Sequence, residues 1–257
     1  MVLRCVGRFL PGSIGKSAAE QLYDHGVGLQ RRGQLEEAVQ AYSEAIRLDP
    51  ALVQAYNNWG AAYINLGKPD LAIPDMNQAI GLKPNLAVAH SARGLAHTSI
   101  GQLDEAVRDL DESIRLNPRF ADAYSGRGIA HKAAGRRQAA IDDFTQAIRV
   151  DPRFAVAYNN RADTYLEMGQ VDRAIPDLDQ AIKLDPWFAV AYANRAFALT
   201  MQQRHEEAQK DIDRAVCLGV PESIGREGQR VESAAFLVSI ETVDRWAYHE
   251  RGRNRSS

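Results

Sequence analysis

Small and apolar residues recur along the chain in units of 34 residues, from Ala19 to Val220. Within a unit they fall three and four residues apart, the spacing of one face of an α-helix. In five units a glycine stands at position 15 and a proline at position 32. Because glycine allows the backbone conformation that ends a helix and proline cannot continue one, each unit is predicted to be helix, tight turn, helix and short loop.

The prolines set the boundaries of six predicted units. These units are 19–52, 53–86, 87–120, 121–154, 155–188 and 189–220. The sixth departs from the pattern, since Gln203 replaces the turn glycine and Val220 replaces the proline. Such divergence is expected where a terminal repeat meets a cap instead of another copy.

Position 8 of each unit is glycine or alanine, and position 20 is alanine in all six. The residues at position 8 are Gly26, Gly60, Gly94, Gly128, Ala162 and Ala196. Small residues at these two places are expected to let the two antiparallel helices of a unit approach closely, with larger side chains at position 24 filling the space between layers.

The segment Tyr56-Asn57-Asn58-Trp59-Gly60-Ala61-Ala62-Tyr63, followed by Gly67, Ala72, Ala79 and Pro84, resembles the tetratricopeptide repeat family. The resemblance recurs six times, from Ala19 to about Glu222. It implies an all-α fold, a right-handed superhelical α-solenoid of stacked antiparallel helix pairs. The first helices are expected to line a concave groove and the second helices a convex face.

In several members of this family, asparagines stacked at position 6 hold the backbone of an extended peptide. An amide suits this role because it can donate and accept a hydrogen bond at once. The resemblance therefore implies peptide contact by exposed Asn58, Asn160 and Asn194, although Ala92 and Gly126 interrupt the series and asparagine is also simply common at this position. The other expected groove residues are Asn57, Asn159, Asn65, Lys132 and Phe197.

Two charged columns run through the units, arginine at position 7 and aspartate at position 23. The arginines are Arg93, Arg127, Arg161 and Arg195, and the aspartates are Asp75, Asp109, Asp143, Asp177 and Asp211. Since nearly every base has one matching acid, we expect an internal Arg–Asp ladder, within or between neighbouring units. The alternative is a binding site for an anionic ligand built from stacked arginines.

Composition narrows the class of protein. The net charge is −2, and the repeat region is more acidic than basic, which disfavours a nucleic-acid partner. No apolar run approaches the 18 residues of a membrane span. The two cysteines, Cys5 and Cys217, fall at opposite ends of the predicted array, where they cannot pair. Unpaired thiols are typical of a reducing compartment such as the cytoplasm.

Catalytic and metal-binding motifs are lacking. There is no GxSxG elbow, no phosphate-binding glycine loop and no zinc-type spacing of histidine and cysteine. His90, His97 and His131 replace tyrosines found at positions 4 and 11 of sister units, which indicates a packing role. We therefore expect no enzyme activity, no metal and no cofactor.

Sequence outside the repeats is interpreted in three parts. Residues 1–18 are basic and are predicted to be a disordered leader, with a targeting or membrane-surface segment as the alternative. Residues 221–248 are predicted to include an amphipathic helix that caps the sixth unit or, alternatively, docks on a partner or membrane. Residues 249–257 are predicted to be a disordered basic tail. Within the repeats, Pro74 and Pro176 are predicted to bend their second helices slightly.

These features predict a scaffold whose concave groove binds a partner peptide or protein. A folding or assembly factor that holds client proteins, possibly at a membrane surface, is the alternative. A regulatory module for a separate enzyme is a third hypothesis.

Overall fold

The computed structural model describes residues 16–220, with the backbone only for Val53, Asn57 and Ile64. Twelve α-helices and no strand occur in this range. The six pairs are α1 (Ala18–Arg31) with α2 (Leu35–Leu48), α3 (Val53–Asn65) with α4 (Pro69–Leu82), α5 (Ala87–Ser99) with α6 (Leu103–Leu116), α7 (Ala121–Ala133) with α8 (Arg137–Val150), α9 (Ala155–Glu167) with α10 (Val171–Leu184), and α11 (Ala189–Met201) with α12 (His205–Cys217).

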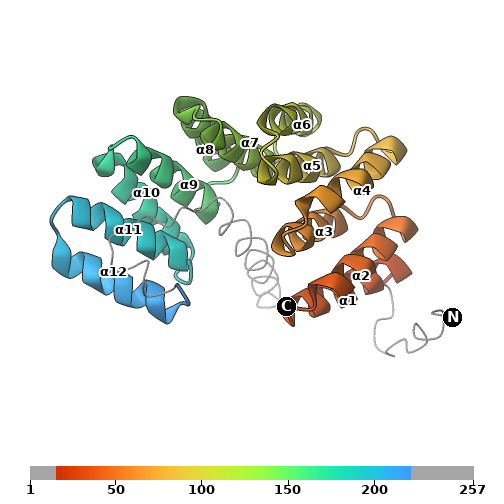
Figure 1. Ribbon diagram of the computed structural model, residues 1–257, viewed down its shortest axis with the longest axis horizontal. Helices are drawn as coiled ribbons and strands as arrows, with labels where there is room; N and C mark the ends of the chain where they lie inside the picture. Colours follow the sequence, from red (N-terminus) through yellow and green to blue (C-terminus); the bar gives the residue numbers. More distant parts are fainter. Residues whose placement is uncertain (1–15, 221–257) are drawn as a thin grey trace.

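The helix pairs follow one another around an open arch (Figure 1). Each helix packs on the next helix in the sequence, and each first helix also contacts the first helix of the following pair. The first helices α3 and α5 lie on the inner side of the arch, and their partners α4 and α6 lie on the outer side (Figure 1). The predicted all-α fold is confirmed, because stacked helix pairs of this kind form an α-solenoid.

Capping and turn residues explain why the helices begin and end where they do. The Ser17 hydroxyl accepts from the Glu20 amide, and the Glu20 carboxylate accepts from the Ser17 amide, a capping box that starts α1. All five turn glycines have positive φ, between 65° and 77°. Gln203 takes the same conformation in the sixth unit, with φ 61°, which is strained for a residue with a Cβ.

Close helix approach at position 8 is found in three of the four units that have glycine there. Gly26, Gly94 and Gly128 pack so tightly that an added Cβ would lie 2.6–2.7 Å from Tyr42, Leu110 or Phe144. At Gly60 a Cβ would meet only the Cβ of Ala92, at 3.5 Å. The expectation of close approach is therefore wrong for the second unit, where no side chain of α4 lies against this glycine.

The core lies between the two layers of helices. The side chains at position 24 of the first five units are fully buried: Tyr42, Met76, Leu110, Phe144 and Leu178. Alanines at position 20 are buried beside them in every unit. The Tyr42 hydroxyl donates to Gln30 Oε1 at 2.7 Å, so this large buried ring leaves no unpaired donor.

The predictions for the two mid-helix prolines and for both ends of the chain remain open. Helices α4 and α10 run without interruption through Pro74 and Pro176 and have the same length, 14 residues, as α2, α6 and α8, so a bend stays a prediction. The predicted leader lies outside the described residues except for its last three, where Ser17 caps α1. The capping helix and the basic tail (221–257) lie wholly outside them.

Candidate functional site on the inner face

Three buried asparagines link α9 and α11, the first helices of the fifth and sixth units. On the inner side of the arch, Asn194 Nδ2 of α11 donates to Asn159 Oδ1 of α9 at 3.0 Å, and Asn159 Nδ2 donates to Asn160 Oδ1 at 3.3 Å. The ends of this amide chain, Asn160 Nδ2 and Asn194 Oδ1, are buried and have no hydrogen-bond partner in the structure. The chain of amides therefore ends in one buried unsatisfied donor and one buried unsatisfied acceptor.

Burial of these asparagines corrects the expectation that they are exposed. Asn58, Asn160 and Asn194 are 8%, 4% and 0% exposed, because the adjacent first helices pack against position 6. Asn58 Nδ2 donates to the Tyr23 hydroxyl at 3.2 Å, a contact between the first two units. The side chain of Asn57 lies outside the described part of the chain. Asn65 is partly buried, and its Oδ1 lacks a hydrogen-bond partner.

A charged cluster lies next to the asparagines. Lys132 of α7 forms an ion pair with Asp163 of α9, and its Nζ is 3.4 Å from Glu167 Oε1. Arg137 Nε donates to Glu167 Oε2 at 3.0 Å. Asp163 is fully buried, and it occupies position 9, where the other five units have apolar residues. That break in the apolar column is the sequence signal for this cluster.

An apolar patch adjoins this polar region on α11. Phe197 is partly buried against the core of the last two units. Met201, one turn further along the helix, is 48% exposed. An apolar patch thus lies on α11 beside the buried amide chain.

The arginine column joins each unit to the one before it. Arg93, Arg127, Arg161 and Arg195 each bind the aspartate 16 residues later, which is Asp109, Asp143, Asp177 or Asp211, with Nε–Oδ2 distances of 2.7–2.9 Å. Nη1 of each arginine also donates to position 25 of the preceding unit, at Asn77, Asp111, Thr145 or Asp179. Each guanidinium group is therefore already paired with an aspartate and links three helices. This arrangement favours the internal ladder over a binding site for an anionic ligand.

The second unit breaks the arginine column. Its position 7 holds Trp59, so Asp75 has no arginine there and instead accepts from the Tyr63 hydroxyl at 3.4 Å. Burial raises the pKa of Asp75 above its ordinary value. Trp59 is buried, and its Nε1 has no hydrogen-bond partner.

The histidines occupy the places of aromatic residues, as the sequence suggests. His90 Nε2 lies 2.9 Å from the Pro84 carbonyl oxygen, the contact that the tyrosine hydroxyl makes in sister units. Among residues 16–220 no group of three or more histidine, cysteine or carboxylate side chains could hold a metal ion. In the same range no helix is long and apolar enough to cross a membrane, and Cys217 is an exposed free thiol.

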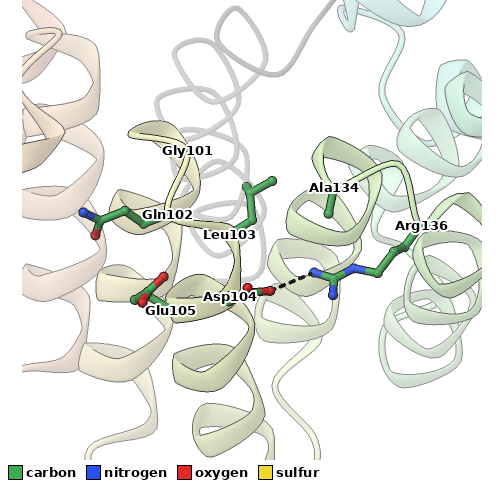
Figure 2. Close-up of a pocket in the computed structure, with 7 residues that line it drawn as sticks. All are labelled: Gly101, Gln102, Leu103, Asp104, Glu105, Ala134 and Arg136. Atoms are coloured by element: carbon green, nitrogen blue, oxygen red, sulfur yellow. Dashed lines mark ion pairs between the residues drawn. The ribbon is translucent and has the colours of Figure 1, made fainter.

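A hollow of about 450 Å³ lies between two neighbouring turns, α5–α6 and α7–α8. Figure 2 shows the side chains that line it. Asp104 and Arg136 face each other across it, with Oδ1 and Nη2 3.7 Å apart (Figure 2). The Asp104 side chain is 79% exposed and that of Arg136 is 43% exposed. A solvated pair on a turn is weak, and the residues that line the hollow include no histidine or cysteine. It is therefore a poor candidate for a catalytic site.

Comparison with known families identifies the repeat. Models described as "TPR repeat" match residues 31–67 and 96–135, and models described as "Tetratricopeptide repeat" match 53–86, 121–154 and 155–188. The chain belongs to the tetratricopeptide repeat family, a class of protein-interaction folds. No curated protein is significantly similar to the sequence.

Solved structures share the fold. A tetratricopeptide repeat protein from Parabacteroides merdae is 26% identical, with 82% of each chain covered and a TM-score of 0.64. The protein MamA is 28% identical over 62% of this chain and 93% of its own, with a TM-score of 0.53. A thermophilic repeat protein from Thermus thermophilus, 22% identical over 71% of this chain and 100% of its own, has a TM-score of 0.63 and shows likeness of fold alone.

Proposed function

We propose that this protein is a non-enzymatic scaffold that binds an extended segment of a partner protein on the inner face of its fifth and sixth units. The observation that carries the proposal is the pair of unsatisfied amide atoms, Asn160 Nδ2 and Asn194 Oδ1. A buried polar atom without a partner costs about 1–3 kcal/mol. Both atoms are covered by neighbouring side chains, so a bound segment would recover this cost only by displacing those side chains. A peptide backbone offers the matching acceptor and donor.

Neighbouring groups indicate the character of the partner segment. Phe197 and the half-exposed Met201 suit an apolar side chain. In the adjoining cluster Asp163 and Glu167 are matched by Lys132 and Arg137, which favours a polar residue without a strong net charge next to that anchor. We therefore expect an extended segment with one apolar anchor and no run of acidic residues.

Site-specific photo-crosslinking tests this function. A photo-reactive residue at exposed Thr200 of α11 should capture one partner in stoichiometric amount, whereas the same residue at exposed Lys210 of α12 serves as the control. Asn194→Ala should reduce capture by roughly tenfold, because each lost hydrogen bond costs about 1.4 kcal/mol or more. Asn58→Ala removes an amide already bonded to Tyr23 and should leave capture unchanged.

The alternative function, a folding or assembly factor, predicts a different result. A holding factor would capture many unfolded clients at Thr200, and neither asparagine would matter to all of them. Equal capture from Thr200 and Lys210, or capture insensitive to Asn194→Ala, would contradict binding at the inner face.

A further inference from the structure

We propose that one edge of the array is a second interaction surface, which binds an acidic segment of a partner protein. The loops between consecutive units form this edge, together with the ends of the second helices that precede them. Within the third to sixth units it gathers cations and one exposed tryptophan. We call this surface the basic edge and define it by Arg119, Arg149, Arg153, Lys183, Trp187 and Arg214.

A missing acid leaves two of these cations unpaired. In the first and third units, the arginine at position 29 is neutralised by a glutamate one turn earlier, at position 26. These ion pairs are Arg47–Glu44 and Arg115–Glu112, with N–O distances of 2.5 and 2.6 Å. The fourth and fifth units have glutamine at position 26, while position 29 keeps its charge in Arg149 and Lys183. Both side chains are exposed, and neither forms an ion pair within residues 16–220.

Loop position 33 adds two more cations. It is alanine or asparagine in the first two units, but arginine in the third and fourth, at Arg119 and Arg153. Both arginines are exposed and without an ion pair in the described part of the chain. Equivalent positions of consecutive units are neighbours in a stacked array, so these charges follow one another along the edge.

Acids are fewer than cations on this edge. Asp151 Oδ1 accepts from the Arg153 amide, and Asp185 Oδ1 accepts from the Trp187 amide, both at 2.9 Å. Asp122, at the start of α7, is a third acid. The repeat region as a whole is more acidic than basic, so the basic edge has a charge opposite to that of its surroundings. A surface of one sign attracts a partner of the opposite sign.

Trp187 occupies position 33 in the fifth unit and is 69% exposed. The Arg214 guanidinium of α12 lies 5.2 Å from the centroid of its ring, and Arg214 Nη2 donates to the Pro186 carbonyl oxygen at 3.4 Å. The cation stabilises one face of the ring. This contact also shows that the second helix of one unit lies against the loop of the preceding unit. By the same phase Lys183 lies beside the loop of Arg153, which makes the basic edge continuous.

Charge and length indicate an acidic protein segment as the partner. Arginine binds a carboxylate through two parallel hydrogen bonds, and tryptophan is among the residues that contribute most to protein interfaces. Trp187 lies two units beyond Arg119, about 16–20 Å at the usual spacing of packed helices. An extended chain covers this distance with about six residues. We therefore expect a short run of acidic residues next to one aromatic or apolar side chain.

A single-stranded nucleic acid fits this edge less well. Proteins that bind single strands combine cations with several aromatic rings, on which successive bases stack. Among the residues that define the basic edge, Trp187 supplies the one ring. Beyond the edge, a phosphate backbone would meet the acidic surface of the repeats.

Fluorescence anisotropy with the full chain tests this surface. The probe is a fluorescein-labelled peptide of about six glutamates with a phenylalanine at each end, so that either chain direction places a ring on Trp187. We expect saturable binding, at least tenfold tighter than binding of the same peptide with glutamine in place of glutamate. Equal affinity for the two peptides would overturn the proposal, as would tighter binding of a single-stranded oligonucleotide of the same charge.

A matched pair of double variants locates the contact. Arg149→Gln with Arg153→Gln removes two charges from the basic edge and should weaken binding at least fivefold. Arg32→Gln with Lys68→Gln removes two exposed charges from turns at the opposite edge and should leave the affinity unchanged. Equal losses in both double variants, or no loss in the first, would overturn the proposal.

Trp187→Ala separates the aromatic contact from the charge. It should weaken binding of the phenylalanine-flanked peptide at least threefold and leave binding of a glutamate run without phenylalanine unchanged. An equal loss for both peptides, or no loss for either, would overturn the part assigned to Trp187. These measurements use no residue of the inner face, so their outcome is independent of the function proposed for the fifth and sixth units.

Discussion

Arg93 and Asp109 form two parallel hydrogen bonds, from Nε to Oδ2 at 2.8 Å and from Nη2 to Oδ1 at 2.5 Å. The arginine is on α5 and the aspartate is on α6, so the pair joins the two helices of the third unit. The same guanidinium donates to Asn77 of α4 at 2.6 Å. One side chain thus fixes both the packing within a unit and the register between units.

Asp109→Asn should destabilise the array. The change leaves a partly buried guanidinium without its anion. Breaking a fully buried ion pair costs about 3–5 kcal/mol. Because the Arg93 side chain is 22% exposed, we expect a smaller loss, about 2–3 kcal/mol. Thermal unfolding followed by circular dichroism should show a lower midpoint at pH 7. A midpoint equal to that of the unchanged chain would contradict a structural role for the ladder.

Asp75→Asn provides the matched control. Asp75 stands in the same column but has Trp59 where other units have arginine, and burial raises its pKa. Removing its charge should therefore maintain or raise the unfolding midpoint at pH 7. If both variants lost stability equally, the arginine would not be the reason for the effect.

Sequence could predict the ladder because its members lie at fixed phases of a strict repeat. Positions 7 and 23 are 16 residues apart, and a helix, a tight turn and an antiparallel helix bring them together. The position in the repeat could not predict the second group that each arginine binds, at position 25 of the preceding unit. The residues there, Asn77, Asp111, Thr145 and Asp179, are of three different types, so they form no recognisable column. The position in the repeat also does not show how closely the next helix covers a side chain. For this reason the sequence did not predict that Asn160 and Asn194 are buried.

Gly94→Ala should destabilise the third unit. A Cβ there would lie 2.7 Å from Leu110 Cγ and 3.1 Å from the Ala106 carbonyl oxygen, and the backbone atom cannot move aside easily. Overpacking of this kind costs about 1–3 kcal/mol. Urea unfolding followed by circular dichroism should show a lower transition midpoint.

Gly60→Ala should have the opposite effect at the equivalent position. A Cβ at Gly60 meets only ordinary contact with Ala92 at 3.5 Å, and alanine favours a helix interior by about 0.5–1 kcal/mol over glycine. We expect a higher midpoint in the same measurement. Loss of stability here would mean that α3 and α4 pack as closely as the other pairs do.

Asn159→Ala should cost more stability than Asn160→Ala. Asn159 is fully buried, and it accepts from Asn194 and donates to Asn160, so its loss leaves two buried groups unpaired, at about 1–3 kcal/mol each. Asn160 contributes an acceptor to this chain, while its donor has no partner to lose. Comparison of the two unfolding midpoints measures the difference, and equal losses would contradict the chain of bonds.

Stability of the third unit should depend on pH through His90. The ring presents Nε2 to the Pro84 carbonyl oxygen, so in the neutral form Nε2 carries the proton and Nδ1 does not. Nδ1 has no hydrogen-bond partner and lies 3.9 Å from Asp109 Oδ1. In the neutral ring Nδ1 and the Asp109 carboxylate are both hydrogen-bond acceptors. Protonation of Nδ1 would turn this contact into an ion pair.

The carboxylate of Asp109 raises the pKa of His90, while burial and the nearby Arg93 oppose the shift. Burial also opposes ionisation of Asp109, but His90 and Arg93 outweigh it and hold its pKa below the ordinary value. His97 faces the same carboxylate, with Nε2 3.7 Å from Oδ2. Since the folded state binds the His90 proton more tightly, its stabilisation is complete below the unfolded pKa of about 6.5 and is lost as pH rises through the folded value.

His90→Tyr isolates this contribution, because tyrosine restores the hydroxyl contact of sister units and does not titrate near neutral pH. The unfolding midpoint of the unchanged chain, relative to that of the variant, should rise when pH falls from 8 to 5.5. His131→Tyr should give the opposite trend, because burial lowers the pKa of His131 and its protonation opposes folding. Parallel trends in the two comparisons would show that general charge effects, and not these two sites, set the pH dependence.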